Sequence, residues 1–108
     1  MIKGIGVDIV SLNRIKNNLY PLSEKILSNR EKEIFNNLES ERRKIEFLGG
    51  RYAFKEALFK ASKNPLGFEK ITLDIDEDGS PLYEDKNVLV SISHEHDYVV
   101  AFVVILEE

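Results

Sequence analysis

The chain has 108 residues, carries 15 Lys+Arg against 19 Asp+Glu, and has a formal net charge of −4. This length allows one small domain, which we place over residues 1–108, and the absence of cysteine excludes disulfides and thiolate chemistry. No apolar run is long enough to span a membrane and the N-terminus lacks a signal-peptide pattern, so we expect a globular, cytoplasmic protein.

The charge is distributed unevenly along the chain. Residues 12–64 hold 12 basic and 7 acidic side chains, whereas residues 65–108 hold 2 basic and 11 acidic ones. An acidic protein therefore has a basic first half. Either this half meets an anionic partner, or its helices are simply solvated.

Residues 1–10 are expected to form the first strand. Apolar side chains alternate there with Gly4, Gly6 and Asp8, which is the period of a strand. Glycine weakens a strand, so the two glycines suggest a close approach by another backbone or a ligand. Ser11 follows the strand and can cap a helix.

Three helices are predicted in the basic half. The first covers residues 12–19 and ends at Pro21, because proline interrupts a helix. The second begins after Ser28, which has capping-box spacing to Glu31. The third is the longest and runs from about residue 41 to 62, after a cap at Ser40.

The last third of the chain has the period of strands. Asn64-Pro65 and Gly67 interrupt the helical pattern, and Asp78-Gly79 is typical of a hairpin turn. Strands are predicted over residues 71–76, 81–83, 88–93 and 98–106. The fold class is therefore α+β, with helices, including one long helix, packed on an antiparallel sheet.

The segment 98–106 differs from the other strands because it is apolar throughout. Both of its faces should therefore be buried. A central strand beneath the helices satisfies this expectation, and so does a strand that also packs against a partner subunit.

The long helix has a clear core face, formed by Phe47, Gly50, Phe54, Ala57, Leu58 and Ala61. Adjacent glycines in a helix cost about 1 kcal/mol each relative to alanine, so Gly49-Gly50 suggests packing against another backbone, for which we nominate the first strand. The charged side chains are expected off this face: Arg42, Arg43, Arg51, Lys55, Glu56, Lys60 and Lys63.

Three charged residues stand out as candidates for chemistry. Glu56 and Lys60 lie one helical turn apart, as a surface ion pair or as a metal-binding carboxylate beside a phosphate-binding ammonium. Asp8 lies among apolar residues and glycines, where a carboxylate needs a partner. It is either a salt-bridge or helix-cap acceptor or a second ligand for Mg²⁺.

A further motif, Ser91-Ile92-Ser93-His94, ends a predicted strand. Small hydroxyls beside a histidine suit phosphate or nucleotide binding, although an ordinary polar sheet face has the same pattern. His94 and His96 alone make a weak transition-metal site. The chain contains no nucleophile set of hydrolase type, no Walker motif and no dinucleotide fingerprint.

Three segments together resemble the holo-acyl-carrier-protein synthases, the small 4′-phosphopantetheinyl transferases. They are Gly4-Ile-Gly-Val-Asp-Ile-Val10, Phe47-Leu-Gly-Gly-Arg-Tyr-Ala-Phe-Lys-Glu-Ala-Leu-Phe-Lys-Ala61 and Val90-Ser-Ile-Ser-His94. Their order and spacing match the family, and the central segment is the specific one.

The resemblance implies a 4′-phosphopantetheinyl transferase fold, a trimer with sites between subunits, and transfer of the phosphopantetheine arm of coenzyme A to a serine of apo-acyl carrier protein. This reaction releases 3′,5′-ADP and supports fatty acid biosynthesis. It implies Mg²⁺ held by Asp8 and Glu56, with Lys60 as the third catalytic residue. It places coenzyme A near Arg51, Lys60, Ser93 and His94, and the carrier near Arg14, Arg42 and Arg43.

One segment departs from the family pattern, since Ser62-Lys-Asn-Pro-Leu-Gly67 stands where a glycine-rich loop is common. A module that binds coenzyme A or carrier protein without catalysis is therefore the first alternative. A nucleic-acid-binding domain is the second, but the net charge of −4 and the lack of an aromatic–basic stacking surface argue against it.

Overall fold

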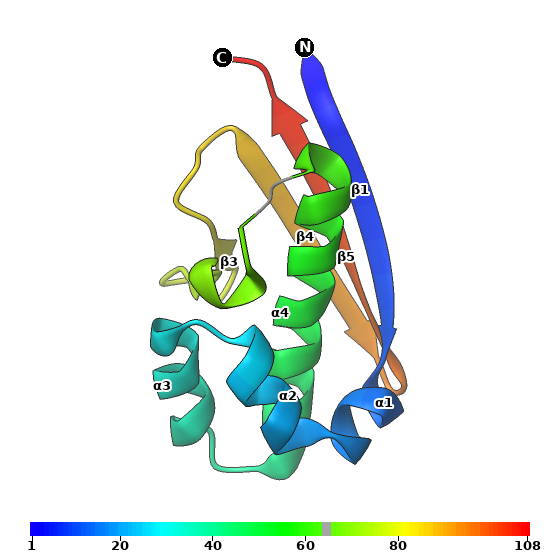
Figure 1. The fold of residues 1–108 in the computed structure, drawn as a ribbon, viewed down its shortest axis with the longest axis vertical. Helices are drawn as coiled ribbons and strands as arrows, with labels where there is room; N and C mark the ends of the chain where they lie inside the picture. Colours follow the sequence, from blue (N-terminus) through cyan, green and yellow to red (C-terminus); the bar gives the residue numbers. More distant parts are fainter. Residues whose placement is uncertain (64–65) are drawn as a thin grey trace.

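The computed structural model describes residues 1–63 and 66–108 (Figure 1). Its elements follow in the order β1 (Ile2–Ser11), α1 (Leu12–Asn17), α2 (Leu19–Ile26), α3 (Asn29–Asn37), α4 (Glu41–Ser62), a 3₁₀ turn (Phe68–Lys70), β2 (Asp74–Ile75), β3 (Pro81–Leu82), β4 (Val88–Glu95) and β5 (Tyr98–Leu106). The expected α+β class is confirmed.

A three-stranded antiparallel sheet in the order β1-β5-β4 forms one layer of the fold. The register places Val7 and Ser91 on either side of Phe102. Helix α4 runs along one face of this sheet, and the three shorter helices gather around one end of it (Figure 1). The strands β2 and β3 form a separate small hairpin.

The core lies between α4 and the inner face of the sheet. The predicted core face of α4 is confirmed, since Phe54, Ala57 and Leu58 are almost fully buried. Opposite them, Val99, Ala101 and Val103 of β5 are equally buried. Among the helices that the structure describes, none has the length and apolar character needed to cross a membrane.

A close approach of two backbones joins β1 to α4. A Cβ atom on Gly6 would overlap the carbonyl oxygen of Ala57, and one on Gly4 would overlap the carbonyl oxygen of Ala61. The glycines of the strand therefore make this contact. The prediction that Gly49-Gly50 packs on the first strand is wrong, because Gly49 meets side chains of Leu12 and Val99, and Gly50 has ordinary space beside Ile92.

The first predicted helix is divided in two. Asn18 leaves the helical conformation (φ −141°, ψ 36°), so α1 ends before it and α2 begins after it. Pro21 does not end a helix but lies in the first turn of α2, where its missing N–H is not needed. Ser11 stands at the N-cap of α1, but its hydroxyl makes no capping hydrogen bond.

The other helix starts follow the prediction. Ser28 and Glu31 form a complete capping box at α3. Ser40 caps α4 by accepting a hydrogen bond from the backbone N–H of Arg43 (3.1 Å). The left-handed residue Lys63 (φ 56°) terminates α4. The predicted break at Asn64-Pro65 lies outside the described residues.

The predicted strand over residues 71–76 is mostly absent, and only Asp74–Ile75 pairs as β2. The backbone of Leu73 is instead hydrogen-bonded to side chains: its N–H donates to Glu31 (2.8 Å) and its carbonyl accepts from Arg51 (3.0 Å). These side chains replace the partners that a neighbouring strand would supply.

Strand β5 is central, as expected, but only one of its faces is buried within this chain. Its other face belongs to an apolar surface of the sheet that remains exposed, which we call the open sheet face. It includes Ile5, Val7, Ile9, Leu89, Ser91, Ser93, Tyr98 and Phe102. The helices of one chain therefore do not cover this face of the last strand, which leaves the alternative of a partner subunit for it, and a surface of this kind is typical of an interface.

Candidate active site

The β1–α4 contact places Asp8 beside Lys60. The Nζ atom of Lys60 lies 3.0 Å from Oδ1 of Asp8 and donates a second hydrogen bond to the carbonyl oxygen of Val7 (3.1 Å). The Asp8 side chain is mostly buried, whereas that of Lys60 is 50% exposed. The partner that the sequence required for Asp8 is therefore this ammonium.

Glu56 lies one turn before Lys60 on α4 and next to Ala57, whose carbonyl meets Gly6. The residue is partly buried. Among the described residues, none forms a hydrogen bond or an ion pair with its carboxylate. The surface ion pair between Glu56 and Lys60 is not formed, because Lys60 bonds to Asp8 instead.

Two carboxylates at one helix–strand contact fit a hard divalent cation. Mg²⁺ commonly uses one or two protein carboxylates and completes its shell with water and substrate phosphate. Within residues 1–63 and 66–108, no group of three or more His, Cys, Asp or Glu is arranged to hold a metal. Asp8 and Glu56 are two carboxylates, which is a number of protein ligands that such a cation commonly has.

A cavity of about 360 Å³ lies at the opposite edge of the sheet, beside β4. Its lining includes Arg43, Glu46, Phe47, Gly50, Arg51, Ile92 and His94. His94 is half exposed, and its Nδ1 lies 3.8 Å from a carboxylate oxygen of Glu46. The cavity is thus lined by the basic side chains of Arg43 and Arg51 and by His94, with the carboxylate of Glu46 beside them.

The other predicted contact residues lie on several elements. Arg42 binds Glu46 (3.1 Å) and the carbonyl of His96 (2.8 Å). Arg14 is exposed on α1, which directly follows β1. Ser93 lies on the open sheet face, whereas the neighbouring His94 contributes to the cavity.

Within one chain, the structure brings Asp8 and Lys60 together, with Glu56 one turn before Lys60 on α4, but it does not bring Ser93 and His94 to them. The carboxylates lie at the β1 edge of the sheet, whereas Ser93 and His94 lie on β4, with β5 between the two strands. The predicted residues therefore form two separate groups on each chain.

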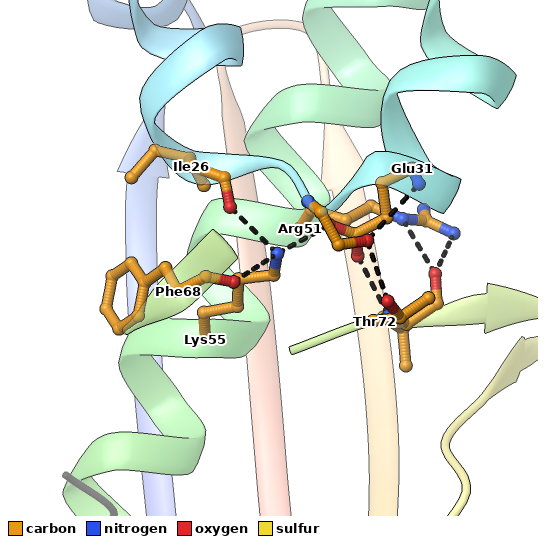
Figure 2. Close-up of polar contacts among 8 residues, drawn as sticks. Ile26, Glu31, Arg51, Lys55, Phe68 and Thr72 are labelled. Atoms are coloured by element: carbon orange, nitrogen blue, oxygen red, sulfur yellow. Dashed lines mark hydrogen bonds and ion pairs between the residues drawn. The ribbon is translucent and has the colours of Figure 1, made fainter. Parts of the chain in front are cut away.

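Arg51 and Lys55 are placed differently from expectation, since both are buried rather than off the core face. Lys55 forms an ion pair with Glu31, which is also fully buried, and donates to the carbonyls of Ile26 and Phe68 (2.9 Å each; Figure 2). The same Glu31 accepts hydrogen bonds from the backbones of Ser28 and Leu73. This pair ties α3 and the segment after α4 to the helix turn that carries Glu56.

Glu31 was not predicted from the sequence to be the buried partner of Lys55. Its capping-box position accounts for only one of its bonds, and the signal that was available is the unusual lysine beside apolar helix positions. Burial lowers the pKa of the Lys55 ammonium, and Glu31 opposes that shift by favouring the charged form.

Arg51 is buried beside this pair. Its guanidinium donates to the carbonyl of Leu73 and lies 4.0 Å from the ring centroid of Phe47. Burial lowers the pKa of Arg51 to about 10, with Glu31 and Asp74 opposing the shift, so the group stays charged at neutral pH. Arg51 therefore supports the fold at Leu73 while it also borders the cavity.

Comparison with known proteins identifies the family of this chain. Residues 4–103 match the family described as the 4′-phosphopantetheinyl transferase superfamily. A holo-[acyl-carrier-protein] synthase of Staphylococcus saprophyticus is 45% identical, covering 97% of this chain and 98% of the relative. The corresponding synthase of Petrotoga mobilis is 36% identical over 100% of this chain and 99% of its own.

A solved structure is similar over the whole fold. The holo-(acyl-carrier-protein) synthase of Bacillus anthracis, in complex with CoA (3′,5′-ADP), superimposes with a TM-score of 0.88 at 38% identity, covering 97% of this chain and 96% of that one. The chain described here belongs to the 4′-phosphopantetheinyl transferase superfamily. The resemblance drawn from its three motifs is thereby confirmed.

Proposed function

We propose that this protein is a holo-[acyl-carrier-protein] synthase. It transfers the 4′-phosphopantetheine arm of coenzyme A to a serine hydroxyl of apo-acyl carrier protein and releases 3′,5′-ADP, which supports fatty acid biosynthesis. The observation that carries the proposal is the group of Asp8, Glu56 and Lys60 at the β1–α4 contact. The names of full-length relatives and the coenzyme A in the similar structure support it.

The roles of these three residues follow from the demands of phosphoryl transfer, which needs positioning and charge neutralisation more than covalent catalysis. Asp8 and Glu56 hold Mg²⁺, which when bound neutralises charge on the pyrophosphate. Lys60 adds a positive charge for a phosphate oxygen. The proton of the attacking serine passes either to Glu56 or to a water that Asp8 and the metal would hold.

The remainder of coenzyme A is assigned to the second group of residues. Arg51, Ser93 and His94 bind its adenosine 3′-phosphate end, with the cavity beside β4 as the pocket. Because this group and the carboxylates lie at opposite edges of one sheet, we propose that each site is completed between neighbouring subunits of a trimer. The open sheet face, with its exposed apolar side chains, is the surface that the subunits share.

The carrier protein is assigned to the basic surface of the helices. Arg14, Arg42 and Arg43 are exposed and can meet an acidic carrier, which increases the association rate and the selectivity more than the affinity. We place this single domain, residues 1–108, in the cytoplasm, because coenzyme A and fatty acid synthesis are found there.

The reaction is tested by mixing the protein with coenzyme A, Mg²⁺ and an apo-carrier protein and measuring the carrier's mass. The expected result is a carrier that gains phosphopantetheine with the wild type. With Glu56→Gln the rate should fall by more than about 100-fold while the circular dichroism spectrum is unchanged. Removing a residue that only orients a metal ligand typically costs about 10- to 100-fold in activity, and removing the ligand itself should cost more.

Two controls define the outcome. The exposed Glu39→Gln removes a carboxylate outside the site and should retain the wild-type rate. A carrier that a known transferase modifies but this protein does not would contradict the enzyme. Coenzyme A binding without transfer would then indicate a non-catalytic module.

A further inference from the structure

The Asp8–Lys60 ion pair uses a carboxylate that the proposed reaction assigns to a metal ion. Oδ1 of Asp8 accepts from the Lys60 ammonium at 3.0 Å. An ammonium in contact with that oxygen and a divalent cation on the same carboxylate repel each other, since both are positive. The Lys60 ammonium therefore lies on the carboxylate oxygen at which the metal is expected.

Lys60 is suited to leaving this position. Half of its side chain is exposed, and both of its acceptors, the Asp8 carboxylate and the Val7 carbonyl, belong to the edge strand β1. Its flexible stem lets the ammonium turn toward an incoming phosphate without any movement of α4. Glu56, one turn away, has no such counter-ion among the described residues.

We propose that Lys60 is the resident counter-ion of Asp8 in the free protein and that the pyrophosphate of coenzyme A draws it away. The carboxylate then becomes available as the metal arrives, so coenzyme A and the metal ion bind cooperatively rather than independently. This inference rests on the proposed function and adds a binding order to it. Because such coupling is reciprocal, each ligand tightens the other by the same factor.

The inference is tested by titrating Mn²⁺, as a paramagnetic probe of the metal site, into the protein without coenzyme A and following free Mn²⁺ by electron paramagnetic resonance. Lys60→Met should bind Mn²⁺ at least about threefold more tightly than the wild type, the range expected for a partly exposed ion pair. With coenzyme A present, wild-type affinity should rise clearly, and that of Lys60→Met should rise less.

Matched variants separate the effect of the Asp8–Lys60 ion pair from the effect of a change in net charge. Lys3→Met removes the same charge from an exposed position of β1 that forms no ion pair with a described residue, and it should behave as the wild type. Lys60→Gln repeats the test with a polar side chain, and circular dichroism confirms that each variant is folded.

The possible outcomes are distinct. Unchanged or weaker Mn²⁺ binding by both Lys60 variants overturns the inference, even if Glu56→Gln abolishes binding and so leaves the proposed function standing. Wild-type Mn²⁺ binding by Glu56→Gln overturns the metal site and the inference together.

Discussion

At the scale of single residues, the buried pair of Lys55 and Glu31 shows how a charge supports the site without belonging to it. Both side chains are fully buried, and the ammonium bonds to carbonyls from two other segments. Removing one partner of such a pair leaves an uncompensated buried charge, which is far more costly than losing a surface ion pair. The pair therefore holds the helix turn that precedes Glu56.

We expect Lys55→Met to lower the free energy of unfolding by about 3–5 kcal/mol, because Glu31 is left charged and unpaired. The double variant Glu31→Gln/Lys55→Met should lose less, since neither charge remains and the amide oxygen of glutamine can still accept a backbone hydrogen bond where Glu31 does. Urea unfolding followed by circular dichroism at one fixed protein concentration measures both. The exposed Lys25→Met should change stability by less than about 0.5 kcal/mol. Equal, small losses in all three variants would show that the pair is not structural.

The residues of the site were predictable to an unequal degree. Asp8 was recognisable as a charge among apolar residues and Lys60 from its spacing to Glu56, yet spacing alone favoured the wrong partner for Lys60. Arg51 and Lys55 were misplaced because helical periodicity assigns charged side chains to the surface. Their burial depends on acceptors distant in the sequence, which no local pattern contains.

At the scale of elements, helix and strand boundaries were predicted correctly where the sequence contains a capping residue or a continuous apolar run. The capping residues Ser28 and Ser40 and the apolar run of β5 behaved as predicted. Pro21 did not, because proline is compatible with the first turn of a helix as well as with its end. The segment around Leu73 failed as a strand because buried side chains satisfy its backbone.

The contact between β1 and α4 gives a prediction for elements. Gly6→Ala should lower stability by several kcal/mol and abolish transfer, because the added Cβ would overlap the Ala57 carbonyl and force strand and helix apart. Gly50→Ala is the matched control, since its Cβ would lie 3.8 Å from Ile92, and alanine should stabilise α4 by up to about 1 kcal/mol. Thermal unfolding measures both, and a tolerated Gly6→Ala would contradict the close contact.

At the scale of the whole molecule, the structure shows which of the unevenly distributed charges are on the surface and which are buried. Arg51, Lys55 and Glu31 belong to the basic segment but are buried, so its surface is slightly less basic than the residue count suggests. The exposed remainder, including Arg14, Arg42 and Arg43, still favours an acidic partner. Of the open sheet face, the sequence indicated only that the last strand, residues 98–106, has no polar positions.

We expect light scattering to give the mass of three 12.4-kDa chains for the wild type. Phe102→Lys should reduce this to one chain, because it places a charge in the centre of the open sheet face. Phe59→Lys changes a similarly exposed phenylalanine of α4 outside that face and should leave the assembly intact. A wild type that remains a monomer at all concentrations would refute the trimer.

The glycine contacts of β1 have a consequence for how such a protein can change over evolutionary time. The separation between β1 and α4 is set at Gly4 and Gly6 by main-chain atoms that approach too closely for a Cβ atom to fit between them. Substitutions among the apolar side chains of the core therefore leave that separation nearly unchanged. Helices α1, α2 and α3 lie to one side of this contact, so their surfaces can change in sequence while the spacing of β1 and α4 is preserved (Figure 1).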